Sequence, residues 1–298
     1  MLPLCGETWG EAAQWAAAQL QNTDCPRLEA ELLLSTLLGV PRTTVLAHPE
    51  TVLSEAVAAA YVEYVRRRCS GEPLPYIRGH AEFFGLNFFI TPDVLIPRPE
   101  TELLVEESLA WMRERLEVSR RGTSSSVLGA GLRAADVGTG SGCIAVALAT
   151  SAPGLHLYAI DLSSPALWVS QVNAERHGVA DRITFLNGDL LTPLPASVDL
   201  IVSNPPYVAE NEWSLLPSSV KREPTLALLG GPDGLNPLRD LLLQSGAHLR
   251  AGGLLLAEIG ERQGAASLEL ARAAFPGAHC SVLPDLSGKD RVLKVRLE

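Results

Sequence analysis

The chain has 298 residues, of which 47% are hydrophobic, and its formal net charge is −10. A chain of this length can bury a large core, so we expect one large domain with a smaller one. No apolar run approaches the ~20 residues that a transmembrane helix needs, and no membrane association is expected. The acidic charge also disfavours stable, sequence-independent nucleic-acid binding, which relies on Lys and Arg.

Cysteine and histidine usage predicts neither a disulfide framework nor a metal site. The five cysteines are widely spaced and form no C-x-x-C pair, and the six histidines show no H-x-x-x-H or H-E-x-x-H spacing. The N-terminus has neither the basic n-region of a signal peptide nor the arginines of a transit peptide. These features favour a protein of the reducing cytoplasm that binds no metal.

Residues 1–72 are predicted to form a small helical bundle. Apolar residues recur at helical spacing over 9–20, 27–38 and 54–69. The run Arg66-Arg67-Arg68 is the compact basic group of this region. It could belong to a basic groove, but a solvated helix C-terminus that complements the helix dipole is the favoured interpretation.

Residues 73–99 are expected to be a β-hairpin linker, because five apolar residues at 83–90 surround Gly85-Leu86-Asn87. Pro99 can begin the next helix, which should run to roughly Leu116. Glu100 and Glu102 could there face a bound ligand's ammonium group or simply complement the helix dipole. The Ser- and Gly-rich segment 119–131 is predicted to be a flexible insertion.

Residues 100–298 are predicted to form an α/β domain in which strands and helices alternate. Strands are expected at 133–137, 155–160, 183–186, 199–203 and 253–259, and helices at 142–150, 165–177, 237–249 and 263–274. Segments 280–283 and 291–297 should close the domain as an antiparallel pair. This alternation predicts a mainly parallel sheet covered by helices on both faces.

A glycine-rich turn, Asp136 to Gly142, follows the first of these strands and opens a helix. Glycines allow positive φ and let a ligand approach the backbone. A dinucleotide fingerprint would need Gly or Ala where Cys143 stands, and no phosphate-loop lysine is present. The turn is therefore suited to a nucleoside-like ligand, although a tight turn without a ligand would show the same pattern.

Two further strand ends carry carboxylates. Asp161 is placed to accept hydrogen bonds from ribose hydroxyls, or it belongs to a helix N-cap together with the serines that follow it. Asp189 could accept from the exocyclic amine of an adenine while Leu190 packs on the ring, or Asp189 is only a turn residue. Ligands of open α/β sheets bind at such carboxyl ends of strands, which favours a binding site here.

The segment Asn204-Pro205-Pro206-Tyr207 follows the fourth strand. The prolines lack N–H donors but keep their carbonyl acceptors, and the Asn204 side chain supplies another acceptor. These groups can hold both hydrogens of a planar –NH₂ group while Tyr207 provides an aromatic wall. Acceptors that orient the nitrogen lone pair and stabilise developing charge suit nitrogen methylation, which needs no strong general base.

The chain resembles the release factor glutamine methyltransferases of the HemK family. The resemblance spans nearly the whole chain, and its most specific part combines two motifs, the segment 91–102 (TPDVLIPRPETE) and Asn204 to Tyr207. It implies a helical N-terminal domain, a hairpin linker and a class I methyltransferase domain that uses S-adenosylmethionine. It also implies methyl transfer to the side-chain N5 of the glutamine in the Gly-Gly-Gln motif of peptide chain release factors.

The resemblance also implies the roles of individual residues. Asn204, Pro205, Pro206 and Tyr207 would hold the glutamine amide, and the helical domain would dock the release factor. The methyl donor would contact a set of residues from the turn and the strand ends: Gly138, Thr139, Gly140, Ser141, Gly142, Asp161, Asp189, Leu190 and Asn204.

Three other functions remain open at the level of sequence. The same active-site segment could methylate another protein glutamine, such as one on a ribosomal protein. It could also methylate adenine N6 in a nucleic acid, which requires a flipped base and usually a basic groove. Finally, the chain could bind the donor without catalysing any reaction. The net charge disfavours the nucleic-acid alternative, and the intact Asn204 segment disfavours the inactive one.

Overall fold

The computed structural model describes residue 4 and residues 6–119 and 127–298. This part of the chain divides into two compact units, Met1–His80 with Pro217–Arg222, and Ala81–Leu216 with Glu223–Glu298. Most of the segment predicted to be a flexible insertion, residues 120–126, lies outside the described residues. No helix in the described ranges combines the length and the hydropathy that a membrane span requires.

The first unit is built from short helices. Its elements are α1 (Trp9–Gln19), α2 (Pro26–Leu38), α3 (Arg42–Ala47), α4 (Glu55–Cys69) and α5 (Leu74–Arg78). Thr8 and Glu11 cap α1 reciprocally, which satisfies two backbone N–H groups of its first turn. Gly39 ends α2 in the left-handed conformation, at φ 66°. Helices α3 and α5 were not expected from the sequence, because six and five residues are too few to show a helical period.

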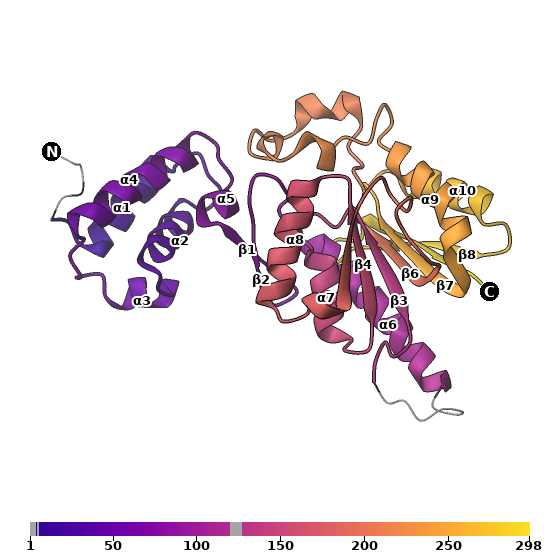
Figure 1. The fold of residues 1–298 in the computed structure, drawn as a ribbon. Coiled ribbons are helices and arrows are strands. Elements are labelled where there is room, and N and C mark those ends of the chain that lie inside the picture. Colours follow the sequence, from indigo (N-terminus) through magenta and orange to yellow (C-terminus); the bar gives the residue numbers. More distant parts are fainter. Residues whose placement is uncertain (1–3, 5, 120–126) are drawn as a thin grey trace. The chain divides into compact units, whose positions relative to one another are not determined.

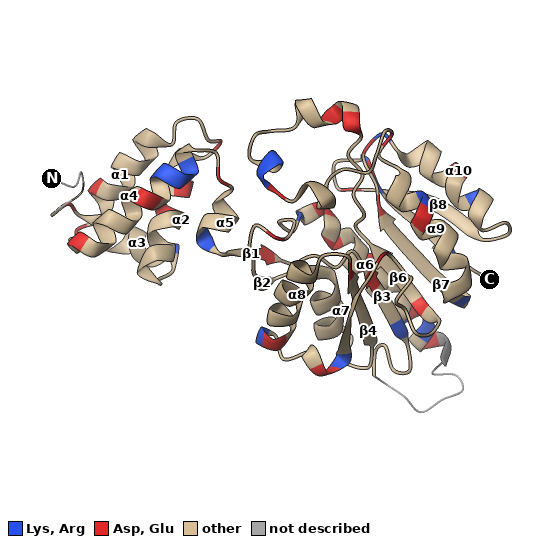
Figure 2. Ribbon diagram, turned by 45° about the horizontal axis from the view of Figure 1, so that its top comes forward, with Lys and Arg blue, Asp and Glu red and all other residues tan. Residues whose placement is uncertain are grey.

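The core of this unit lies between α1, α2 and α4. Tyr61 is fully buried, and its hydroxyl donates a 2.8 Å hydrogen bond to the carbonyl of Ala30. The basic run at the end of α4 is neutralised within the unit, since Arg66, Arg67 and Arg68 pair with Glu63, Glu72 and Glu29 respectively. In Figure 2, segments of Lys or Arg (blue) and of Asp or Glu (red) lie next to one another among the helices of this unit. The pairing agrees with the helix-terminus interpretation of the run rather than with a basic groove.

The second unit begins with the expected hairpin, β1 (His80–Phe83) and β2 (Leu86–Phe89). Its turn is Phe84-Gly85, and both residues have positive φ, 51° and 71°. The Phe84 N–H donates to the Glu102 carboxylate at 2.7 Å. Glu102 therefore secures the hairpin turn, whereas Glu100 is exposed. A 3₁₀ turn (Pro99–Thr101) leads into α6 (Glu102–Ser119).

The rest of this unit is a sheet covered by helices, as predicted. The remaining regular elements are β3 (Arg133–Val137), α7 (Cys143–Ser151), β4 (His156–Asp161), α8 (Ser164–Arg176), β5 (Ile183–Asn187), β6 (Val198–Ser203), α9 (Asn236–His248), β7 (Leu249–Glu258), α10 (Gly264–Ala274), β8 (His279–Pro284) and β9 (Asp290–Arg296). Short 3₁₀ turns at Ala180–Arg182, Glu210–Leu215, Val220–Arg222 and Thr225–Ala227 complete the described chain, and they were not predicted.

Among the described residues, the sheet has seven strands in the order β5-β4-β3-β6-β7-β9-β8. Strands β3 to β7 pair in parallel, and β9 runs antiparallel between β7 and β8. Helices α6, α7 and α8 cover one face, and α9 and α10 cover the other (Figure 1). Strand β6 is buried along its whole length, because the sheet is covered on both sides. Successive strands extend from β3 toward β5 on one side and from β6 toward β7 on the other, so the strand order reverses between β3 and β6 and their carboxyl ends open a crevice for a ligand.

Candidate active site

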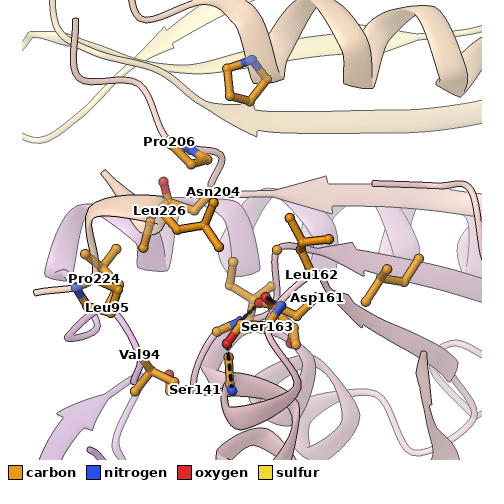
Figure 3. Close-up of a pocket in the computed structure, with 18 of the residues that line it drawn as sticks. Val94, Leu95, Ser141, Asp161, Leu162, Ser163, Asn204, Pro206, Pro224 and Leu226 are labelled. Carbon is orange, nitrogen blue, oxygen red and sulfur yellow. Dashed lines mark hydrogen bonds between the residues drawn. The ribbon is translucent and has the colours of Figure 1, made fainter. Parts of the chain in front are cut away.

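A cavity of about 260 Å³ lies at the carboxyl ends of these central strands. Figure 3 shows its walls, with Asp161 and Ser163 after β4, Asn204 and Pro206 after β6, and Val94 with Leu95 from the segment after the hairpin. All of its lining residues belong to the second unit.

The glycine-rich turn is fixed to the tip of β4 by backbone hydrogen bonds. Gly138 and Thr139 both donate to the carbonyl of Ile160 at 2.9 Å. Gly140 donates to the Asp161 carboxylate at 2.8 Å. Gly138 has φ 72°, and a Cβ placed there would meet no atom within 4 Å. The turn therefore presents bare backbone to the cavity, where a side chain would take up space.

Asp161 keeps acceptor capacity toward the cavity. Its second oxygen accepts from the Ser163 N–H at 2.8 Å, so each oxygen uses one lone pair on the backbone. Burial raises the pKa of this carboxyl, while the backbone N–H donors of Ser163 and Gly140 act in the opposite direction. Ser163 is the N-cap residue of α8 and caps the helix with its own side chain. The helix cap therefore does not need the Asp161 carboxylate, which had been considered for that role.

Asp136 lies behind the turn and is fully buried. One carboxylate oxygen accepts from the Thr139 hydroxyl at 2.7 Å and from the Ala145 N–H at 3.1 Å. The other oxygen has no hydrogen-bond partner among the described residues. Burial raises the pKa of Asp136 to about 7.

The remaining predicted residues fall into two groups. Thr139, Ser141, Asp189 and Leu190 line the cavity, whereas Gly142 does not. A Cβ on Gly142 would collide with Ser170 of α8. The glycine at this position is therefore required by the close packing of the turn on α8, and its φ of 79° adds to the requirement.

The Asn204 segment meets a network of buried polar side chains. Asn204 donates from Nδ2 to the Thr101 hydroxyl at 3.1 Å, and Thr101 donates to Glu258 at 2.6 Å. The Tyr207 hydroxyl donates to the other oxygen of Glu258 at 3.2 Å. Burial raises the pKa of Glu258, while the Thr101 hydrogen bond and the nearby Arg291 charge act against that rise. Asn204 and Pro206 line the cavity, but Pro205 is buried behind them and Tyr207 is outside the lining.

Two parts of this site were not predicted from the sequence to border the cavity or its polar network. The segment 93–98 forms a wall of the cavity, and Glu223 accepts from the Ile96 N–H at 3.0 Å and pairs with Arg98 at 2.5 Å. Glu258 was also missed, although it ends the apolar run 254–257. A lone carboxylate at the end of a buried strand was the same signal that identified Asp161.

Residues 11–79 match the family described as PrmC N-terminal domain, and residues 125–218 match the methyltransferase small domain. The release factor glutamine methyltransferase of Moorella thermoacetica is 44% identical over 283 residues, which cover 95% of this chain and 94% of that protein. The chain belongs to the release factor glutamine methyltransferase family.

Other relatives agree with this membership. The protein of the same name from Nitratidesulfovibrio vulgaris is 40% identical and covers 92% of this chain and 90% of its own length. Among solved structures, the hMettl16 catalytic domain in complex with a MAT2A 3′UTR hairpin is 19% identical, with a TM-score of 0.54 and 82% of each chain covered. The likeness to the hMettl16 catalytic domain shows the fold alone, which together with the match to the methyltransferase small domain is that of a class I methyltransferase.

Proposed function

We propose that this enzyme transfers a methyl group from S-adenosylmethionine to the side-chain N5 of the glutamine in the Gly-Gly-Gln motif of peptide chain release factors. Relatives named release factor glutamine methyltransferase match over nearly the whole chain, which supports the proposal. The observation that carries the proposal is the position of Asn204, whose amide borders the same cavity as the glycine-rich turn.

The residues of the turn and the strand ends fit a nucleoside with a sulfonium. Asp161 has free acceptor capacity for ribose hydroxyls, and Gly138 leaves open space that a Cβ would fill. Asp189 and Leu190 border the same cavity and would hold the adenine, while Thr139, Gly140 and Ser141 offer their backbone. When bound, S-adenosylmethionine supplies an electrophilic methyl group on its sulfur.

On the other side of the cavity, this chain's own groups orient the glutamine. The Asn204 Oδ1 and a carbonyl of the Pro205-Pro206 pair accept hydrogen bonds from the two amide hydrogens. An amide nitrogen held in this way directs its lone pair at the methyl carbon, and positive charge that develops on nitrogen meets acceptor oxygens. Tyr207 supports the segment through its hydrogen bond to Glu258. We assign the docking of the release factor to the helical domain, residues 1–72.

The test is methylation of a purified release factor with isotope-labelled S-adenosylmethionine, followed by mass spectrometry of the Gly-Gly-Gln peptide. One added methyl group on the glutamine is expected, and none on a factor whose glutamine is replaced by asparagine. Parallel reactions should contain ribosomal proteins, single-stranded DNA and RNA. Labelling of one of these instead of the release factor would overturn the proposal.

A further inference from the structure

Glu258 is a buried carboxylate that the reaction itself does not require. It is 1% exposed at the end of β7, and both of its oxygens accept hydrogen bonds from hydroxyl groups, one from Thr101 and one from Tyr207. A buried carboxylate is costly unless such donors compensate it. These two hydrogen bonds therefore direct the hydroxyl hydrogens of Thr101 and Tyr207 toward Glu258.

The direction of the hydrogen bonds then follows from the donor inventory. A hydroxyl has one hydrogen and two lone pairs, whereas Glu258 in its ionised form, which Arg291 and the two hydroxyl donors favour against burial, can only accept. Thr101 gives its hydrogen to Glu258 at 2.6 Å, so it can offer Asn204 only a lone pair. The Asn204 group that meets Thr101 at 3.1 Å must therefore be the Nδ2 donor. If the Asn204 amide were rotated by half a turn, its Oδ1 would face the Thr101 oxygen. Two acceptors would then meet with no hydrogen between them.

We infer that Thr101, held by Glu258, is a positioning residue that sets the rotation of the Asn204 amide so that Oδ1 faces the substrate amide. Without it, the carboxamide could turn and present its NH₂ group to the substrate's NH₂ group, where no hydrogen bond can form. This inference rests on the proposed function. The sequence separation is large, since Thr101 precedes α6 and Asn204 follows β6.

The first test is Thr101→Val, which replaces the hydroxyl by a methyl group of similar size. We expect kcat for release-factor methylation to fall about tenfold, because part of the Asn204 population turns. The Kd for S-adenosylmethionine, measured by calorimetry, should change less than twofold. Thr101→Ser keeps the hydroxyl and should restore most of kcat. Ser108→Ala is the matched control, because it removes a buried hydroxyl from α6 that donates to the Leu104 carbonyl within the same helix.

A second test separates positioning from general support of the site. In an Asn204→Ala background, Thr101→Val should cost nothing further, because the side chain through which Thr101 acts is gone. Glu258→Gln should lower kcat less than Thr101→Val, since its amide can still turn an oxygen toward Thr101.

The outcomes distinguish the inference from the function on which it rests. If the unaltered enzyme does not methylate release factors, the proposed function fails. If it does, and Thr101→Val retains full kcat or lowers kcat equally in the Asn204→Ala background, the positioning role is wrong. Thermal unfolding of each variant shows whether it is folded, and a Thr101→Val protein that does not fold leaves Thr101→Ser and Glu258→Gln to decide.

Discussion

The two walls of the cavity are built by different means. The wall with the glycine-rich turn is made of backbone and local contacts, since Gly138, Thr139 and Gly140 bond to the end of the adjacent strand. The opposite wall depends on side chains, and the orientation of Asn204 rests on Thr101, 103 positions earlier in the sequence. Apart from Asp161 and the glycines, the first wall uses backbone groups that most side-chain substitutions leave in place, whereas the opposite wall depends on a series of hydroxyl, amide and carboxylate groups whose hydrogen-bond directions change when one member is replaced.

The largest expected effect tests the side-chain wall. Asn204→Ala should lower kcat by ~10²-fold or more, in line with the loss of one preorganised polar group, while donor affinity stays near normal. Single-turnover kinetics at saturating donor, with calorimetry for donor binding, measure the two separately. Asn87→Ala, which removes an exposed amide from the hairpin, is the control. A variant that loses donor affinity and keeps its turnover would assign Asn204 to the wrong wall.

The corresponding change in the backbone wall is Asp161→Ala. A hydrogen bond to a charged group contributes ~1.5–3 kcal/mol, so the donor Kd should rise by about tenfold to a hundredfold. Turnover at saturating donor should change much less. Equilibrium dialysis with labelled donor provides the measurement. Normal donor affinity in this variant would remove Asp161 from the site.

Two glycines of the turn form a matched pair. Gly138 and Gly142 have nearly the same φ, 72° and 79°, so alanine should cost either position roughly 1–2 kcal/mol of backbone strain. Gly138→Ala adds a methyl group to the cavity and should weaken donor binding. Gly142→Ala adds a collision with Ser170 and should lower the free energy of unfolding further. Urea unfolding and donor titration of both variants test this division, and equal losses of affinity would contradict it.

A separate effect, on stability rather than on binding or turnover, concerns Asp136 and pH. Burial raises the pKa of Asp136 from its ordinary 3.8 to about 7. Between these values the folded state keeps a proton that the unfolded state has released, so the free energy of unfolding falls as pH rises through the interval. Asp136→Asn has no such titration. Its stability relative to the unaltered enzyme should therefore increase from pH 4 to pH 7 and level off above, as measured by urea unfolding at each pH. A pH-independent difference would mean that the carboxyl titrates normally.

Local patterns predicted most of the fold and one wall of the site. The period of apolar residues gave the long helices and the buried strands, and short-range motifs gave Gly138 and Asp161. Helix α5 was not predicted, because five residues are too few to show a helical period. The roles of Thr101 and Glu258 in the site were not predicted for another reason. Their roles depend on contacts across 103 and 157 positions of sequence, and only the completed sheet brings them together.

Gly142 and Tyr207 make contacts that the motifs did not predict. Gly142 was predicted to contact the methyl donor, which stays a prediction; in the structure it packs closely against α8 and is not among the residues that line the cavity. The ring of Tyr207 was predicted to form an aromatic wall, which stays a prediction, and its hydroxyl donates a hydrogen bond to Glu258. A motif therefore indicates where a site lies, whereas the contacts in the structure show what each of its residues can do.

Strand β9 follows every other strand in the chain, yet it lies between β7 and β8. Val292 of β9 pairs with Glu258 itself, and Lys294 forms an ion pair with Glu107 of α6 at 2.7 Å. During synthesis, the edge of β7 that receives β9 stays open until residues 290–296 have left the ribosome. The carboxylate that holds Thr101 thus gains its partner on the neighbouring strand only when the last strand of the chain is in place.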